Sequence, residues 1–417
     1  MNPHFAYKDN ILMAEGVSLA DIAAQVGTPA YVYSKAAFTA PLDAFADAFK
    51  DVPHLVCFAV KTSANLSLLR LVAEKGQGAD IVSGGELYKS LKAGIAADKV
   101  VFSGVGKTGR EMREALEAGI MMFNVESAEE LALLSRVAGE MKKIAPVAMR
   151  LNPAVDPHTH PYVATGLKES KFGLDRETAL GLYAQAARDP NVSVVGLSCH
   201  IGSQLTSIAP FLEAAAKLKG VAQELAGMGI QLKYFDMGGG LGVNYNDETP
   251  PALAEYAAGL KGLLRDVPGL TLVLEPGRYV SGPSGLLLTQ VLYNKINGEK
   301  RFVVIDGAMN DLIRPGLYGS YHRVLPVCRT GAPEVTVDVV GPICESTDFL
   351  AKGRALPQVA GGDLLAVMDA GAYGFSMSSN YNARPRAAEA LVDGDSFTVV
   401  KARETYADLV RGEDPSA

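Results

Sequence analysis

The stretch Leu55-Val56-Cys57-Phe58-Ala59-Val60-Lys61 gives the first indication of the fold. An uninterrupted apolar run of this length is typical of a strand that is buried on both faces of a parallel sheet. In an α/β barrel the side chain at the end of such a strand lies at the face that carries the chemistry. Burial there would disfavour the ammonium form of Lys61 and leave more free amine, which can form a Schiff base. In the alternative interpretation the lysine stem lies along the strand and its ammonium group reaches solvent.

Seven more apolar runs follow along the chain, and helix-like segments separate them. Together the strand-like runs cover residues 55–61, 79–83, 99–103, 121–126, 146–151, 194–201, 233–237 and 271–275. The amphipathic segments between them include residues 85–93, 109–118, 127–138 and 208–226. Strands that alternate with helices indicate βαβ units and a parallel sheet. Eight such units over this length predict a (β/α)8 barrel.

The ends of these runs are unusually polar. They read Lys61, Ser83-Gly84-Gly85-Glu86, Ser103-Gly104, Glu126-Ser127, Arg150-Leu151-Asn152-Pro153, His200-Ile201-Gly202-Ser203, Gly238-Gly239-Gly240 and Glu275-Pro276-Gly277-Arg278. Glycine and asparagine end strands in any protein, so the glycines alone are weak evidence of a site. Lysine, histidine, glutamate and arginine on one rim are what the catalytic face of a barrel requires.

The same residues suggest a cofactor. Gly238, Gly239 and Gly240 follow the seventh run, where barrels often bind phosphate through backbone N–H groups. Pyridoxal phosphate needs such a phosphate site, a lysine for its aldehyde and a partner for its ring nitrogen. Lys61 and Glu275 can fill the second and third roles, and His200 could stack on the ring. The alternative for His200 is a histidine whose hydrogen bonds are satisfied within the core.

Composition limits the other classes of function. The chain has 417 residues, more than one ordinary hydrophobic core accommodates, so we expect two domains. Its 48% hydrophobic and 20% charged residues are typical of a soluble globular protein. The formal net charge of −7 argues against a nucleic-acid-binding surface, which needs clustered Lys and Arg. No stretch approaches the ~20 apolar residues of a membrane span, and the first residues lack the apolar core of a signal peptide.

The cysteines and histidines point to no metal site. Cys57, Cys199, Cys328 and Cys344 lie far apart and lack the spacing of zinc ligands. A reducing, cytoplasmic setting is the simplest interpretation of this distribution. His158 and His160 form a close pair between prolines without further ligands nearby, so we expect a solvated loop there.

Seven motifs, in this order along the chain, resemble those of fold-type III pyridoxal-phosphate decarboxylases. They are Phe58-Ala59-Val60-Lys61, Ser83-Gly84-Gly85-Glu86-Leu87, Ser170-Lys171-Phe172-Gly173, Cys199-His200-Ile201-Gly202-Ser203, Gly238-Gly239-Gly240, Glu275-Pro276-Gly277-Arg278 and Cys344-Glu345-Ser346. Within that group the chain most closely resembles the bacterial diaminopimelate decarboxylases, from about Tyr31 to Arg386. Ala164 is a small departure, because relatives often carry serine there.

The resemblance implies an α/β fold with two domains. A pyridoxal-phosphate-binding (β/α)8 TIM barrel would cover residues 30–280. A β-sandwich or barrel-like domain would cover residues 281–417 and include the N-terminal segment, residues 1–29. The sequence after Val280 agrees independently, because β-rich runs such as residues 302–306 and 335–340 lie between turn signals.

The resemblance also implies roles for the matching residues. Lys61 would hold the cofactor aldehyde, His200 would stack on the ring and Glu275 would hold the pyridinium nitrogen. The phosphate would be bound by Ser203, Gly239 and the backbone of Gly277 and Arg278, with help from Tyr373, and Gly238 and Gly240 would also belong to the cofactor site. The substrate would be contacted by Arg278, Arg314, Tyr318, Glu345 and Tyr373. Cys344 would serve as the proton donor from the neighbouring subunit of a homodimer, whereas on its own a free cysteine is most often a small buried hydrophobe.

The implied activity is decarboxylation of meso-2,6-diaminopimelate to L-lysine and CO2, the last step of lysine biosynthesis. A guanidinium such as that of Arg314 suits the carboxylate at the far end of this substrate, although an arginine can also form a surface ion pair of little weight. The alternatives are a decarboxylase of ornithine, arginine or carboxynorspermidine, an amino-acid racemase, and an inactive cofactor-binding homologue. Glu275 disfavours the racemase, which typically places an arginine at the pyridine nitrogen.

Overall fold

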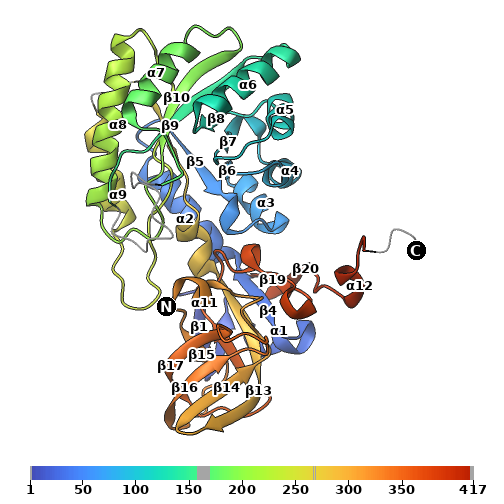
Figure 1. The fold of residues 1–417 in the computed structure, drawn as a ribbon. Coiled ribbons are helices and arrows are strands. Elements are labelled where there is room, and N and C mark those ends of the chain that lie inside the picture. The colour runs from blue at the N-terminus through green and yellow to red at the C-terminus, as the bar shows by residue number, and fades with distance from the viewer. Residues whose placement is uncertain (1, 157–169, 266, 268, 414–417) are drawn as a thin grey trace. The chain divides into compact units, whose positions relative to one another are not determined.

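The computed structural model describes residues 2–156, 170–265, 267 and 269–413, and it divides into two compact units (Figure 1). The barrel unit comprises Pro41–Asn244 and Glu248–Tyr279. The β unit comprises Met1–Ala40, Tyr245–Asp247 and Val280–Ala417. His158, His160 and Ala164 lie outside the described residues.

Eight parallel strands close the barrel, as the sequence predicts. They are β5 (His54–Ala59), β6 (Gly78–Ile81), β7 (Val100–Phe102), β8 (Met122–Val125), β9 (Ala145–Leu151), β10 (Val192–Cys199), β11 (Tyr234–Asp236) and β12 (Thr271–Leu274). Each pairs in parallel with the next along the chain, and β12 pairs with β5 to complete the ring. Apolar side chains such as Val101, Met122, Ala148, Val195 and Val273 pack together in one core cluster.

Helices lie around the barrel strands (Figure 1). They are α2 (Lys35–Ala48), α3 (Leu66–Glu74), α4 (Gly84–Lys92), α5 (Gly109–Ala118), α6 (Ala128–Met141), α7 (Arg176–Ala186), α8 (Ala209–Gly227) and α9 (Leu253–Leu264). Helix α2 precedes β5, and each of the other helices follows a strand. Local sequence sets their starts: Thr108 and Glu111 form a capping box at α5, and the Ser127 hydroxyl accepts from the Glu130 N–H at α6. The predicted helical segments are therefore confirmed to within a few residues.

Lys61 does not lie in the strand, and this part of the prediction is wrong. Strand β5 ends at Ala59, and Val60–Thr62 form a single turn of 3-10 helix, η1. The Thr62 hydroxyl donates to the Ala59 carbonyl at 2.9 Å, and the Ser63 N–H donates to the Val60 carbonyl at 3.0 Å. These local bonds replace the strand ladder and place Lys61 on the turn beyond the strand.

The β unit contains a three-stranded sheet and a nine-stranded sheet. The first is formed by β1 (Phe5–Lys8), β2 (Ile11–Ala14) and β3 (Val17–Ser18), followed by helix α1 (Leu19–Val26). The second contains β4 (Ala30–Ser34), β13 (Gly285–Asn297), β14 (Lys300–Ile305), β15 (Val324–Pro326), β16 (Glu334–Val340), β17 (Phe349–Pro357), β18 (Leu364–Val367), β19 (Ala388–Asp393) and β20 (Ser396–Lys401). The predicted mostly β domain, which includes the N-terminal segment, is confirmed.

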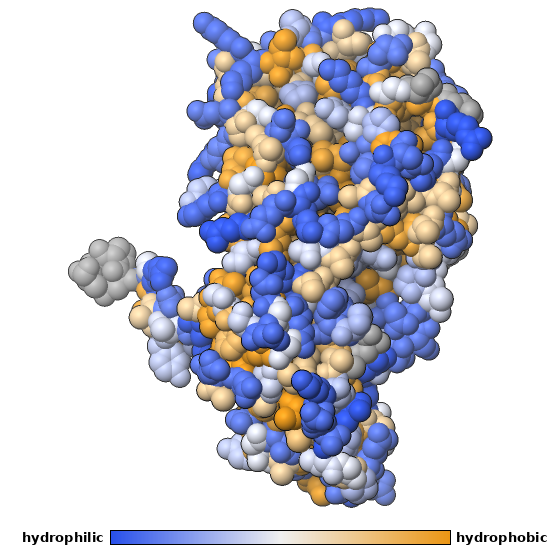
Figure 2. All heavy atoms as spheres, turned by 180° about the vertical axis from the view of Figure 1, so that it is seen from behind, coloured by the Kyte–Doolittle hydropathy of each residue, from blue (hydrophilic) through white to orange (hydrophobic). Residues whose placement is uncertain are grey.

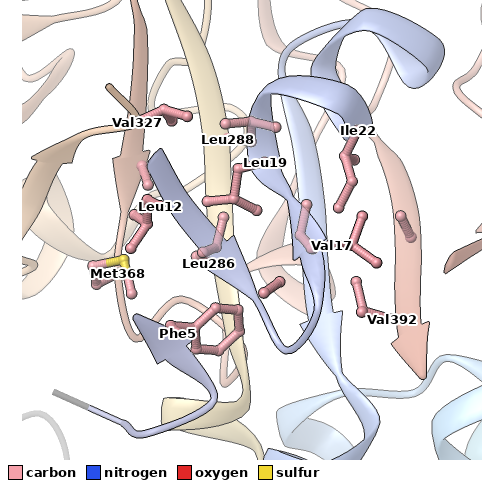
Figure 3. Packing of buried hydrophobic residues seen from close by; sticks show 14 residues of the cluster. Phe5, Leu12, Val17, Leu19, Ile22, Leu286, Leu288, Val327, Met368 and Val392 are labelled. Carbon is pink, nitrogen blue, oxygen red and sulfur yellow. The ribbon is translucent and has the colours of Figure 1, made fainter. Parts of the chain in front are cut away.

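One hydrophobic core joins the N-terminal segment to this sheet (Figure 3). Phe5, Leu12 and Leu19 pack with Leu286 and Leu288 of β13.

Residues 30–40 also belong to the β unit rather than to the barrel, because β4 pairs with β13 and β19.

The surface carries no membrane signal in the described residues. Hydrophilic and hydrophobic residues are interspersed over the face shown in Figure 2. None of the helices in the described part of the chain combines the length and the apolar character needed to cross a bilayer. The described histidines, cysteines and carboxylates also form no cluster of three or more that could hold a metal ion.

Candidate active site

Lys61 is paired with an acid at the rim of the barrel. Its Nζ lies 2.6 Å from Oδ2 of Asp80, a fully buried residue of β6. About a third (34%) of the Lys61 side chain is exposed, so its amine is within reach of a ligand. The other oxygen of Asp80, Oδ1, is buried and has no hydrogen-bond partner among the described residues. The pair holds the amine at a defined position without burying it.

Glu275 follows β12 and shares a hydrogen bond with another acid, Asp236 at the end of β11. Two carboxyl groups can form such a bond only when one of them carries a proton. Burial and the charge of Asp236 raise the pKa of Glu275 well above its usual range, so Glu275 is the protonated partner. The pKa of Asp236 is raised to about 6 by burial, against the stabilising bonds from the Gly238 N–H and the Asn124 amide at 2.8 and 2.9 Å.

The hydrogen bond to Asp236 does not satisfy both oxygens of Glu275. Its Oε1 is buried and has no hydrogen-bond partner among the described residues. A buried polar atom in this state costs roughly 1–3 kcal/mol, which a ligand hydrogen bond would recover. Because the proton of Glu275 is used in the bond to Asp236, Oε1 can only accept, and it is placed for a hydrogen-bond donor on a bound ring.

One hydrogen bond sets the orientation of the His200 ring, directly after β10. Its Nδ1 accepts a hydrogen bond from the Gly239 N–H at 3.2 Å, which leaves Nε2 to carry the proton. Desolvation, followed by the charges of Arg150 and Lys61, lowers the pKa of His200 well below its usual range. A neutral imidazole held in this way presents a flat face, which suits stacking on an aromatic ring.

Arg150 and Glu126 form a buried ion pair beside this group. Arg150 Nη1 lies 2.7 Å from Oε1 of Glu126. The central carbon of its guanidinium lies over the Phe172 ring, 4.9 Å from the ring centre. The Gly173 N–H donates to Oε2 of Glu126 at 2.9 Å. Gly173 has a φ of +74°, which favours glycine. The motif Ser170-Lys171-Phe172-Gly173 thus closes around the pair and fixes Arg150, whose charge acts on His200.

The glycines after β11 make a close backbone cradle. A Cβ on Gly239 would lie 2.1 Å from the carbonyl oxygen of Glu275, and one on Gly240 would lie 2.5 Å from that of Gly202. Gly277 is equally restricted, because its Cβ would meet the side chain of Thr62 at 2.6 Å. Only residues without a side chain allow the strand ends to approach so closely.

Two residues predicted to bind phosphate meet in the barrel unit. Arg278 begins α10 (Arg278–Ser281), and its Nε and Nη2 donate to the Ser203 hydroxyl at 3.1 and 2.9 Å. Arg278 is buried, so its charge is held in place by the surrounding protein. A hydroxyl and a guanidinium at this position, together with glycine N–H groups, suit an anion such as phosphate.

The remaining predicted residues belong to the β unit. Arg314 and Tyr318 begin and end helix α11 (Arg314–Tyr318), with Arg314 buried and Tyr318 half-buried. Tyr373 adopts a φ of +56°, which is uncommon for a residue with a side chain and marks a constrained segment.

Cys344 and Glu345 are both exposed on a tight turn of the β unit. The Cys344 N–H donates to Oδ1 of Asn382 at 2.8 Å, and the carboxylate of Asp348 accepts from the Ile343 N–H at 2.6 Å. The turn therefore presents both side chains outward while its backbone is held by Asn382 and Asp348.

Sequence reasoning missed several members of the barrel site. The sequence motifs do not predict Asp80, Asp236 and Asn124 as site residues. They place Arg150 and Glu126 at strand ends but give them no role in the site. The available signal was an acid inside an apolar strand, as in Gly78-Ala79-Asp80-Ile81. A charge in a strand buried on both faces must find a partner, which at a barrel rim is often functional.

The barrel site fits pyridoxal phosphate. Lys61 could supply the amine for its aldehyde, and Oε1 of Glu275, which has no hydrogen-bond partner among the described residues, could face its ring nitrogen. Ser203, Arg278 and the glycine cradle supply donors for its phosphate. The aldehyde, the ring nitrogen and the phosphate of the cofactor thus each have a matching group on the barrel unit.

Comparison with known proteins agrees with this fit. Residues 35–282 match the family described as "Pyridoxal-dependent decarboxylase, pyridoxal binding domain". The diaminopimelate decarboxylase of Pseudomonas aeruginosa is 54% identical over 411 residues, which cover 98% of each chain.

Solved structures show the same similarity. The diaminopimelate decarboxylase of Helicobacter pylori, complexed with L-lysine, has a TM-score of 0.92 and 41% identity, covering 94% of this chain and 98% of that chain. The enzyme of M. jannaschii, in co-complex with L-lysine, has a TM-score of 0.95 and 38% identity, covering 100% of this chain and 98% of that chain. The similarity therefore extends over both units.

Proposed function

Because this chain belongs to the family of diaminopimelate decarboxylases, we propose that it removes one carboxylate of meso-2,6-diaminopimelate as CO2 and releases L-lysine. This is the last step of lysine biosynthesis. The observation that carries the proposal is a single barrel rim with an accessible amine, a buried carboxyl oxygen without a partner and a glycine cradle, in a chain of this family.

Pyridoxal phosphate, when bound, supplies an aldehyde for the substrate amine and a ring that takes up the electron pair left by the departing CO2. The residues of the barrel unit prepare this chemistry. The amine of Lys61 would hold the cofactor through its aldehyde, and Asp80 keeps this amine in place. Glu275, backed by Asp236, would face the ring nitrogen, where the single negative charge of the acid pair favours the cationic ring.

Further residues orient the cofactor and the substrate. His200 would stack on the cofactor ring, and its neutral form avoids a second positive charge beside Arg150. Ser203, Gly239 and the backbone of Gly277 and Arg278 would bind the phosphate, with help from Tyr373, and Gly238 and Gly240 would complete the glycine cradle. The far end of the substrate carries a carboxylate and an ammonium group. Arg278, Arg314 and Tyr318 suit the carboxylate, Glu345 suits the ammonium group, and Tyr373 would also contact the substrate.

We also propose that the enzyme is a cytoplasmic homodimer in which Cys344 donates the proton in the site of the neighbouring subunit. The exposure of Cys344 supports this role, since a thiol in the core could not reach a partner. The β unit also leaves Tyr293 and Ile296 of β13 exposed, and apolar surface of this kind suits a partner subunit.

A substrate panel tests the proposed activity. Purified protein with pyridoxal phosphate is incubated with meso-diaminopimelate, ornithine, arginine and carboxynorspermidine, and released CO2 and product mass are measured. We expect turnover of diaminopimelate to L-lysine and far slower reaction of the others, since only diaminopimelate satisfies both Arg314 and Glu345. Faster release of CO2 from another substrate would assign the alternative activity.

A further inference from the structure

Arg314 is held by three uncharged groups of the β unit. Its Nη1 lies 2.9 Å from Nε2 of His322, and its Nη2 donates to the Ser320 hydroxyl at 3.4 Å. The guanidinium carbon lies 4.8 Å from the centre of the Tyr245 ring. Both Arg314 and His322 are buried, with 4% and 0% of their surface exposed. Burial of this degree holds the arginine in one conformation.

The protonation state of His322 follows from its two neighbours. Its Nδ1 lies 2.8 Å from the carbonyl oxygen of Met368, which can only accept a hydrogen bond, so Nδ1 must carry the hydrogen. A guanidinium can only donate, so Nε2 must be the unprotonated nitrogen that accepts from Arg314. His322 is therefore neutral and held in a single tautomer between a backbone carbonyl and the arginine.

Tyr245 and His322 restrict different motions of the guanidinium. The Tyr245 ring beneath Arg314 fixes the plane of the guanidinium group. The bond to His322 fixes its rotation within that plane, and the His322 ring meets Tyr245 edge-on at 5.5 Å and 72°. Two parallel N–H bonds to a carboxylate require both settings to be correct.

We propose that His322 is the positioning residue that makes Arg314 selective for the far carboxylate of the substrate. This inference rests on the proposed function, because it takes Arg314 as the group that binds that carboxylate. His322 touches no reacting atom and acts only through the arginine. The loss of His322 should therefore weaken ligands that carry this carboxylate and leave the chemical step unchanged.

The test compares two ligands that differ only in the carboxylate. L-Lysine carries it, whereas cadaverine has the same carbon chain and both amines without it. In His322→Leu we expect the inhibition constant of L-lysine and the KM for diaminopimelate to rise about tenfold or more, the effect of weakening one charge-assisted pair. We expect the inhibition constant of cadaverine and the value of kcat to stay within about threefold of wild type, because this binding is the same in ground and transition states.

Two further variants keep the test decisive. His322→Gln places an amide oxygen near the position of Nε2, where it can accept from Arg314, so we expect it to recover part of the preference for L-lysine. His54→Leu is the matched control, because His54 also bonds a backbone carbonyl through Nδ1, at 3.0 Å from Val52, but begins β5 in the barrel unit. It should leave the ratio of the two inhibition constants unchanged.

Equal weakening of L-lysine and cadaverine in His322→Leu would mean a merely structural role and would overturn the inference. An unchanged preference for L-lysine would do the same. If His322→Leu fails to fold, the same comparison is made with His322→Gln, and equal weakening there again overturns the inference. Binding of both ligands can be measured by calorimetry without turnover, so an inactive wild type would reject the proposed function separately.

Discussion

Asp236 and Glu275 show how the surroundings of single residues set their charge. Both acids are buried at the end of neighbouring strands, and they are hydrogen-bonded to each other. Because two negative charges repel each other strongly in a hydrogen-bonded pair of acids, one proton stays with the pair. In a cofactor enzyme this matters, since the acid at the ring nitrogen sets how strongly the ring withdraws electrons.

The pair of Asp236 and Glu275 should change how the stability of the protein depends on pH. The pKa of Asp236 rises on folding from 3.8 to about 6, so its contribution to stability is present below the unfolded value and is lost as the pH rises through about 6. We therefore expect Asp236→Asn to reduce the fall in melting temperature of the cofactor-free protein between pH 5 and pH 8. The slope should not vanish, because burial still raises the pKa of Glu275.

Asp175 provides the matched control for this substitution. Its pKa is lowered by hydrogen bonds from Thr178 at the start of α7, so it stays ionised between pH 5 and pH 8. Asp175→Asn should leave the slope of melting temperature against pH unchanged. An equal slope for wild type and Asp236→Asn would show that Asp236 does not hold a proton in this range.

At the scale of elements, the strands of the barrel could be predicted closely, whereas their side-chain partners could not. The apolar run of β5 and the caps of α5 and α6 are local signals, so their positions were predicted to within a few residues. The turn that carries Lys61 depends on bonds of Thr62 and Ser63 that no periodicity reveals. Pairs such as Asp236 with Asn124 join residues more than a hundred positions apart, which only the closed barrel brings together.

The close approach of the glycine backbone after β11 predicts that a side chain at Gly239 is not tolerated. Gly239→Ala should destabilise the protein by roughly 1–3 kcal/mol or more and weaken cofactor binding, because the new Cβ overlaps backbone that cannot move aside. The atom in its way is the carbonyl oxygen of Glu275, only 2.1 Å from the Cβ position. Denaturant unfolding and titration with pyridoxal phosphate measure the two effects.

Gly220→Ala serves as the control for this prediction. Gly220 lies within α8, and apart from its chain neighbours and the nearby backbone of the helix, no heavy atom of the described residues lies within 4 Å of its Cβ position. Alanine is the better helix former by about 1 kcal/mol, so this variant should be slightly more stable and bind the cofactor normally. Equal behaviour of the two variants would argue against a close cradle at Gly239.

At the scale of the whole molecule, the proposed sharing of the site between two subunits makes a quantitative prediction. Lys61→Ala and Cys344→Ala should each be nearly inactive alone. In an equal mixture that exchanges subunits, half of the dimers are mixed and each has one intact site, so activity should recover to about one quarter of wild type. Recovery is measured after refolding the two variants together.

Two results would contradict the shared site. Absence of recovery in a mixture shown to contain mixed dimers would place Lys61 and Cys344 of the same subunit together. Normal turnover by Cys344→Ala alone would assign Cys344 a packing role only.

The identity of the lysine that holds the cofactor is the most direct test. Protein loaded with pyridoxal phosphate is reduced with borohydride, digested and sequenced by mass spectrometry. We expect the cofactor mass on Lys61 alone, and we expect Lys61→Ala to lose the visible absorbance of the bound cofactor. A label on another lysine, or a Lys61→Ala variant that keeps both the absorbance and turnover, would contradict the assignment of this barrel rim as the active site.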